Sequence, residues 1–159
     1  MYSRLDHLAG EQAPSRICST TMMELPQPER GEGGPRPLEP GAERTDEFAV
    51  EGPLLTDVGG TIGMSVLSTP GMIAMMERTS AVLSYERLPE GSATVGFEVC
   101  IKHVGGAAEG ATCTASAKLT EVLDGRKLFF DVEVREGERT IGVGTHQRRV
   151  IQVPPAEEG

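Results

Sequence analysis

Alternation of apolar and polar residues dominates the second half of the chain and predicts strands. Four such runs cover residues 93–103, 112–123, 127–135 and 140–153. Asp124-Gly125 separates the second run from the third and is a strong signal for a two-residue hairpin turn. Because hairpins join antiparallel neighbours, the pattern predicts a four-stranded antiparallel meander with its last strand at an open edge.

In the first of these runs, the alternate positions that are otherwise apolar end with a polar residue. Its apolar parity carries Val95, Phe97, Val99 and Ile101 and then reaches His103. We therefore expect these five side chains to share the buried face of one strand, with Gly96 on the opposite face.

A helical spacing precedes the four runs. Thr69-Pro70 reads as an N-cap followed by Pro at the first helical position, and the helix is expected to end near residue 88, before Pro89. Methionines and a leucine at helical spacing mark a buried stripe, formed by Met72, Met76 and Leu83. A short alternating run at residues 60–67 predicts one more strand before the helix.

One helix of this length can cover one face of an antiparallel sheet. The predicted fold class is therefore α+β, in the hot-dog arrangement, with the sheet wrapped around one long central helix. Such a small unit with an open sheet edge is expected to form a homodimer by extending the sheet.

The N-terminal segment differs from the rest in composition. Six of the 11 prolines lie within residues 1–45, among Gly and charged residues with few apolar side chains. A segment of this kind buries too little apolar surface to offset its ordering entropy. We expect residues 1–45 to be a disordered tail and residues 46–155 to form the single folded domain.

Charge and cysteine usage limit the function classes. The net charge of −9 argues against a nucleic-acid surface, which needs clustered Lys and Arg. The three cysteines show no CxxC spacing, so neither a disulfide framework nor a zinc site is indicated. No apolar run has the length of a membrane span or the form of a signal peptide, which predicts a cytoplasmic protein with no membrane partner.

Three polar residues on otherwise apolar elements are candidates for chemistry: Thr69, Glu77 and His103. Each also has an ordinary structural explanation. Thr69 suits a helix cap, Glu77 suits the solvated face of an amphipathic helix, and His103 suits a turn beside the Gly-rich segment that follows it. The residues taken singly leave both interpretations open.

The order of motifs adds a family resemblance. The segments "VLSTPGMIAMME", "ATVGFEVCIKHVGGAAEG", "DGRKLFFDVEV" and "IGVGTHQRRV" resemble the hot-dog thioesterases of the fluoroacetyl-CoA thioesterase type. The resemblance covers residues 61–153 and includes spacings of eight residues from Thr69 to Glu77 and 26 from Glu77 to His103.

The resemblance implies an acyl-CoA thioesterase in which Thr69, Glu77 and His103 form the catalytic set. It further implies that Gly96 helps to place the thioester carbonyl and that Arg148, from the "GTHQR" motif, lies near the acyl-CoA. His146 of the same motif is expected to be a surface or hydrogen-bonding residue. No metal or redox cofactor is expected, since nucleophile, proton donor and oxyanion donor can all come from the chain.

The acyl group and the activity class leave alternatives open. Members selective for fluoroacetyl groups carry aromatic residues ahead of the helix, whereas this chain has "VGGTIGMSVLS" there, which argues against fluoroacetyl selectivity and for another small acyl group. A non-catalytic acyl-CoA-binding module and another hot-dog activity, such as a dehydratase, are the alternative functions. The sequence does not decide whether Thr69, Glu77 or water attacks the thioester.

Overall fold

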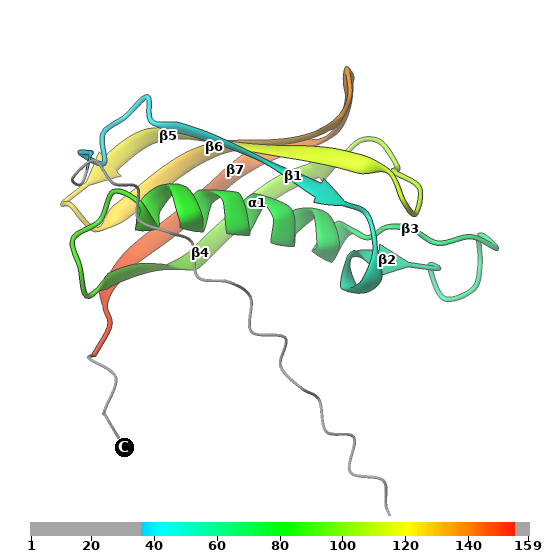
Figure 1. Ribbon diagram of the computed structural model, residues 1–159, viewed down its shortest axis with the longest axis horizontal. Coiled ribbons are helices and arrows are strands. Elements are labelled where there is room, and N and C mark those ends of the chain that lie inside the picture. Colours follow the sequence, from blue (N-terminus) through cyan, green and yellow to red (C-terminus); the bar gives the residue numbers. More distant parts are fainter. Residues whose placement is uncertain (1–35, 155–159) are drawn as a thin grey trace, which may run out of the picture.

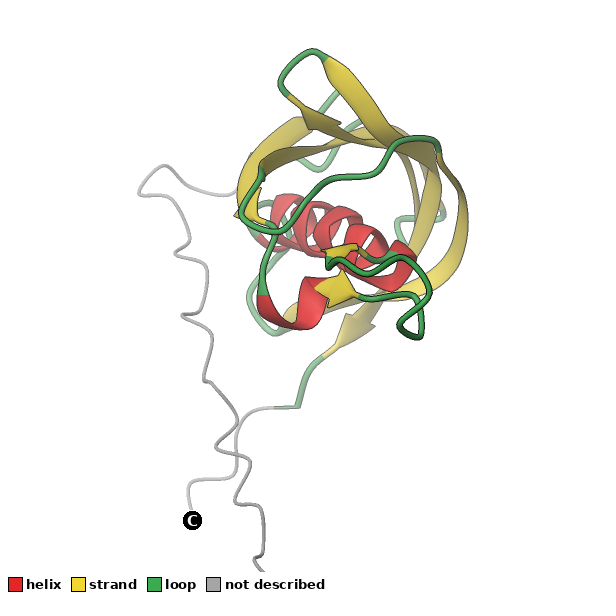
Figure 2. Ribbon diagram, turned by 90° about the vertical axis from the view of Figure 1, so that its right-hand side faces the viewer, coloured by secondary structure: helices red, strands yellow, loops and turns green. Residues whose placement is uncertain are grey.

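The computed structural model describes residues 36–154, and one long helix lies inside a curved antiparallel sheet (Figures 1 and 2). The helix is α1, Thr69–Tyr85. The sheet contains β1 (Glu43–Ala49), β4 (Ser92–His103), β5 (Thr112–Leu123), β6 (Lys127–Glu136) and β7 (Arg139–Gln152). The prediction of an α+β hot-dog arrangement is confirmed, because the concave face of the sheet wraps around α1.

A small second layer closes the N-terminal end of the helix. It consists of the 3-10 helix η1 (Gly52–Leu54) and the two-stranded pair of β2 (Leu55–Thr56) with β3 (Val66–Leu67). The predicted strand at residues 60–67 is wrong except for its last two residues. Ile62 and Met64 are exposed in a turn with several positive-φ glycines, because the chain reverses there.

The strand order differs from the predicted meander. The order is β1-β5-β6-β7-β4, so β4 pairs with β7 and not with β5, its successor along the chain. The reason lies in the connections: tight turns join β5 to β6 and β6 to β7, whereas residues 104–111 form a longer link that carries the chain across the sheet. The edge strands are therefore β1 and β4, and β7 is internal.

β1 also corrects the expected boundary of the folded domain. Residues 43–45 belong to this strand and pair with β5, although they were assigned to the tail. The strand lacks a clear alternation of apolar and polar residues because several of its side chains are charged. These side chains form ion pairs: Arg44 pairs with Asp46 and Glu86, and Glu43 pairs with Lys118. The expected disorder of residues 1–35 lies outside the described residues.

The core is aliphatic and rich in methionine. Met72, Met75 and Met76 on α1 are buried, as is Leu83, which confirms the predicted helical stripe. They face small residues of β5 and larger ones of β6 and β7, namely Cys113, Ala115, Ala117, Leu119, Leu128, Phe130, Val132, Val134 and Ile141. The small side chains of β5 allow the helix to approach the sheet closely.

Two buried serine hydroxyl groups on α1 bond to the helix itself, whereas the buried Thr79 hydroxyl has no hydrogen-bond partner among the described residues. Ser80 Oγ donates to the Met76 carbonyl and Ser84 Oγ to the Ser80 carbonyl, at 2.9 and 2.8 Å. These bonds satisfy polar atoms that would otherwise be costly to bury. Within residues 36–154, no helix combines the length and the apolar character that crossing a membrane requires.

Candidate active site

The start of α1 is capped by Ser68 and not by Thr69. Ser68 Oγ accepts a hydrogen bond from the Gly71 N–H at 2.9 Å, and its backbone is extended, as an N-cap requires. A Cβ atom on Gly71 would lie 2.5 Å from the Leu54 carbonyl oxygen, so the helix start packs directly on η1. The predicted cap was one residue too late, and Thr69 is left with a hydroxyl that the helix does not use.

Thr69 and His103 are in contact, as the site prediction requires. Thr69 Oγ1 lies 2.9 Å from His103 Nδ1, within hydrogen-bonding distance, and Thr69 is exposed. His103 Nε2 is buried and has no hydrogen-bond partner among the described residues. Because only one ring nitrogen is engaged, by a hydroxyl that can donate or accept, the surroundings of His103 do not fix its tautomer.

Glu77 lies elsewhere on the helix. Its side chain is 42% exposed, and its Oε1 atom lies 3.7 Å from His146 Nε2 and 3.8 Å from Arg148 Nη1. A catalytic Glu77 was expected to be largely buried and close to a histidine; the burial is wrong, since the side chain is partly exposed, and the nearby histidine is His146. Within one chain Glu77 lies away from Thr69 and the His103 that Thr69 contacts, because eight helical residues separate Glu77 from Thr69 by about 12 Å along the axis.

Gly96 faces Glu77 because β4 contains a bulge. The pairing with β7 shifts register between Gly96 and Glu98, leaving Phe97 as the extra residue. Gly96 thereby joins the helix-facing side, whereas Val95 and Phe97 are exposed, at 45% and 63%. The predicted buried face of this strand is therefore wrong before the bulge.

The absence of a side chain at Gly96 makes room for the Glu77 carboxylate. A Cβ atom on Gly96 would lie 2.3 Å from Glu77 Oε1 and 3.5 Å from His146 Cε1. The first of these separations is not possible without movement of the carboxylate. Gly96 therefore acts on the position of Glu77, which lies over the strand at this point.

Arg148 is held by β4 and by its own strand. Its Nε and Nη2 atoms donate to Thr94 Oγ1 and to the Thr94 carbonyl at 2.8 and 2.9 Å, and its Nη1 lies 3.0 Å from His146 Nε2. Burial lowers the pKa of the Arg148 guanidinium, and the negative charge of Glu77 opposes that shift. An arginine stays protonated in proteins, so Arg148 places a buried positive charge beside Glu77.

His146 is buried, 1% exposed, although it was expected at the surface or in a hydrogen bond. Its Nδ1 atom bonds the Glu98 carbonyl at 2.9 Å, which agrees with the second expectation. Burial lowers the pKa of His146, and the charge of Arg148 acts in the same direction. A signal was present in the sequence: His146 and Arg148 share the parity of Val150, which is buried.

The predicted residues thus form two clusters in one chain. The first, which we call the hydroxyl cluster, contains Thr69 and His103 at the start of α1. The second, the carboxylate cluster, contains Glu77, Gly96, His146 and Arg148 near the middle of α1. Seven residues of β4 separate Gly96 from His103, or about 20 Å.

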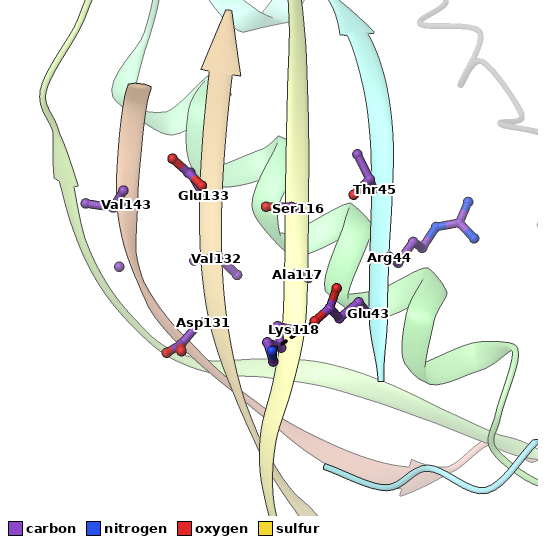
Figure 3. Close-up of a pocket in the computed structure, with 11 residues that line it drawn as sticks. Glu43, Arg44, Thr45, Ser116, Ala117, Lys118, Asp131, Val132, Glu133 and Val143 are labelled. Atoms are coloured by element: carbon purple, nitrogen blue, oxygen red, sulfur yellow. Dashed lines mark ion pairs between the residues drawn. The ribbon is translucent and has the colours of Figure 1, made fainter. Parts of the chain in front are cut away.

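Neither cluster overlaps a hollow of about 430 Å³ on the other face of the sheet (Figure 3). Its charged lining residues are three carboxylates and two cations, namely Glu43, Asp131, Glu133, Arg44 and Lys118, so the hollow has no surplus of positive charge for an anionic ligand such as a CoA ester. A second hollow, of about 480 Å³ and mainly apolar, lies between α1 and Thr94, the residue that holds Arg148. Within residues 36–154, no group of three or more His, Cys, Asp or Glu side chains is arranged to hold a metal ion.

Comparison with known proteins gives consistent relatives. The fluoroacetyl-CoA thioesterase of Streptantibioticus cattleyicolor is 33% identical over 88 residues, which are 55% of this chain and 63% of that relative. A crystal structure of a variant of the fluoroacetyl-CoA-specific thioesterase FlK with fluoroacetate and CoA shares 28% identity, with a TM-score of 0.62 over 72% of this chain and 96% of that one. The chain thus spans less than two thirds of the length of its curated relative.

A more distant structure supports the fold alone. The hot-dog-like protein from Thermanaerovibrio acidaminovorans is 18% identical, with a TM-score of 0.64 over 71% of this chain and 83% of that one. The model of the family described as fluoroacetyl-CoA-specific thioesterase matches residues 54–154, from η1 to the end of β7. The match includes both polar clusters, and the chain belongs to this family.

Proposed function

We propose that the protein hydrolyses a small acyl-CoA thioester to the free acid and CoA. The observation that carries the proposal is the 2.9 Å contact between the exposed Thr69 hydroxyl and His103 Nδ1. A hydroxyl bonded to an imidazole is the arrangement that activates an oxygen nucleophile. The family match and the CoA complex of FlK support a CoA thioester as the substrate.

The proposed reaction proceeds in two steps. His103 accepts the hydroxyl proton as Thr69 Oγ1 attacks the thioester carbonyl carbon, the C–S bond breaks, and the CoA thiolate takes the proton from His103. A carboxylate then takes a proton from a water molecule as its oxygen attacks the carbonyl carbon of the acyl-Thr69 ester. The ester C–O bond to Thr69 breaks, the free acid leaves, and the proton passes from the carboxyl group to Thr69 Oγ1, which restores the hydroxyl and the carboxylate. These two reaction steps require only side chains of the protein and water, so we propose no cofactor.

The carboxylate for the second step comes from a second copy of the chain. β4 is a long edge strand whose exposed face includes Val95 and Phe97, and such an edge favours pairing with another strand. Two copies of β4 paired antiparallel around a two-fold axis midway between Gly96 and His103 set these two residues opposite each other. We therefore propose a homodimer in which the hydroxyl cluster of one subunit meets the carboxylate cluster of the other.

The acyl group and the location are extensions of this proposal. The turn before β3 exposes Ile62 and Met64 and carries no aromatic residue, so we propose a small acyl group other than fluoroacetyl. Arg148 as a direct substrate ligand stays a prediction, since its guanidinium already donates to Thr94. A cytoplasmic location also stays a prediction.

The proposed activity is tested with purified protein, a panel of short acyl-CoA esters and a free-thiol assay. Thiol release that disappears in Thr69→Ala and His103→Ala supports it, and a covalent acyl group on Thr69, seen by mass spectrometry, supports the first step. If every ester binds without thiol release, the protein is an acyl-CoA-binding module. Hydration of an enoyl-CoA with intact thioester would instead indicate a dehydratase-type activity.

The shared site is tested by mixing two inactive variants. Co-expressed Thr69→Ala and Glu77→Ala chains form mixed dimers in which one of the two sites is complete. Half of the dimers are mixed and half of their sites are intact, so about a quarter of the wild-type activity is expected. No recovered activity, with dimers present by sedimentation, would show that each site uses a single chain.

A further inference from the structure

His146 is engaged at both ring nitrogens, which sets it apart from His103. Its Nδ1 atom lies 2.9 Å from the backbone carbonyl of Glu98, and its Nε2 atom lies 3.0 Å from Nη1 of Arg148. The ring is buried between β7 and α1 and lies near Phe130, with ring centroids 6.5 Å apart. Nothing in the proposed reaction uses this histidine directly.

The chemistry of the two neighbours determines the proton position on this ring. A guanidinium has only donors, so Nε2 must be the acceptor of the bond from Arg148. A carbonyl oxygen has only lone pairs, so Nδ1 must carry the proton. His146 is therefore the neutral ring with its proton on Nδ1, and burial lowers its pKa, which supports the neutral form.

This tautomer controls the orientation of Arg148. Thr94 receives two of the guanidinium N–H groups, and His146 receives a third from Nη1, the nitrogen that also lies 3.8 Å from Glu77 Oε1. Without the acceptor at Nε2, Nη1 would keep only the longer contact to the Glu77 backbone carbonyl, at 3.5 Å, beside the carboxylate. Since Gly96 leaves space for the carboxylate and Arg148 supplies its charge partner, the orientation of Arg148 determines where Glu77 rests.

We propose that His146 is a positioning residue that acts through Arg148 to hold the Glu77 carboxylate for its catalytic role. The proposal rests on the proposed thioesterase function and adds a residue that touches neither the substrate nor the reacting atoms. In this proposal the bond that Nε2 accepts from Arg148 serves catalysis, and the bond that Nδ1 donates to the Glu98 carbonyl serves the stability of the fold.

Two amide substitutions separate these parts. His146→Gln places an amide at the distal position, where it can accept from Arg148, whereas His146→Asn places one at the Nδ1 position, where it can donate to Glu98 but cannot reach Arg148. We expect His146→Gln to keep most of the wild-type kcat and His146→Asn to lose about tenfold, the scale of one hydrogen bond to a charged group. KM is expected to change by less than about twofold in both.

Val150→Ala is the control for general loss of packing. Val150 is buried on the same face of β7, two residues beyond Arg148, and contributes no polar atom to the cluster. This variant is expected to lower the melting temperature and to leave kcat near the wild-type value. Equal losses of kcat in His146→Gln and His146→Asn, or a matching loss in Val150→Ala, would overturn the proposal.

A second measurement does not depend on activity. Long-range proton–nitrogen NMR correlations of the His146 ring at pH 7.5, assigned by comparison with His146→Gln, report the tautomer. A proton on Nδ1 supports the proposal, and a proton on Nε2 or a doubly protonated ring overturns it. An active wild-type enzyme with the wrong tautomer defeats the positioning role alone, whereas the correct tautomer without thiol release from any ester defeats the proposed function.

Discussion

The two polar clusters on α1 differ in what surrounds them. The hydroxyl cluster lies at the helix start, where Thr69 is exposed and the ring of His103 has one unpaired nitrogen. The carboxylate cluster lies two turns later, where His146 is 1% exposed and both of its ring nitrogens are engaged. Among the described residues, the surroundings of His103 therefore leave its tautomer open, whereas those of His146 fix the position of its proton.

This difference separates chemistry from support. A group that transfers protons must exist in two protonation states during turnover, so it benefits from surroundings that fix neither state. A group that orients a charge benefits from the opposite, because each fixed hydrogen bond reduces the range of orientations of its neighbour. Substitutions in the hydroxyl cluster should thus affect activity more than stability, and those of the buried pair His146 and Arg148 should affect stability as well.

The largest expected effect is on activity in the hydroxyl cluster. Thr69→Ala and His103→Ala should each lower kcat by about a thousandfold, because each removes a group that takes part in bond formation or proton transfer. Thermal unfolding should change by only a few degrees, since Ser68 and not Thr69 caps the helix. Thiol-release kinetics and melting curves on the same samples would check this. A large loss of stability in either variant would contradict the proposed difference between the two clusters.

The next effect is on stability in the carboxylate cluster. Arg148→Met should lower the free energy of unfolding by about 3 kcal/mol, because it leaves Thr94 and His146 without their donor in a buried setting. Arg149→Met is the matched control: Arg149 is the next residue, lies 3.8 Å over the exposed Phe97 ring and should cost less than about 1 kcal/mol. Urea unfolding of both variants measures the difference, and similar values would mean that the buried network contributes little.

A smaller effect is expected from Gly96→Ala. The added Cβ would meet the end of the flexible Glu77 side chain, so the fold can adjust, but the carboxylate must move. We expect kcat to fall by roughly tenfold with little change in melting temperature. Gly106→Ala serves as the control, because a Cβ there meets no atom within 4 Å. Full activity of Gly96→Ala would show that the position of Glu77 is not critical.

The smallest effect is a pH dependence of stability that comes from His146. Its pKa is lowered in the folded state, so below the ordinary histidine value the unfolded chain binds a proton that the folded chain does not. Stability should therefore fall as the pH drops below about 6.5, by at most about 1.4 kcal/mol per pH unit from this group. His146→Gln should show a shallower fall from pH 7 to 5 by urea unfolding. An identical slope would mean that other groups determine it.

The sequence predicts the elements of this fold better than their connections. Helical spacing of Met72, Met76 and Leu83 and the Asp124-Gly125 turn give α1 and the β5–β6 hairpin correctly. The pairing of β4 with β7 was not predicted. Alternation of apolar and polar residues indicates that a strand is present but does not indicate which strand lies beside it in the sheet. β1 was missed because its charged side chains pair with one another across elements.

For the candidate site, the sequence indicated the candidate residues but not the two separate clusters that they form in the structure. Thr69 and His103 meet as expected, through the spacing of the family motif. The grouping of Glu77 with Gly96 depends on the bulge at Phe97, which reverses the parity of half a strand. No alternation rule contains such a shift, so Val95 and Phe97 were placed on the wrong face.

The bulge also determines how this strand tolerates changes of length. Gly96 and His103 are seven residues apart, an odd spacing that would place them on opposite faces of a regular strand, and the extra residue at the bulge brings both to the helix-facing side. Loss of Phe97 would straighten the ladder and leave both clusters with their β4 residue, whereas insertion of one more residue between Gly96 and His103 would turn one of them to the other face unless a second bulge formed. Among relatives, a one-residue gap between these positions therefore marks a strand without the bulge, and a one-residue insertion marks a chain in which one cluster lacks its β4 residue.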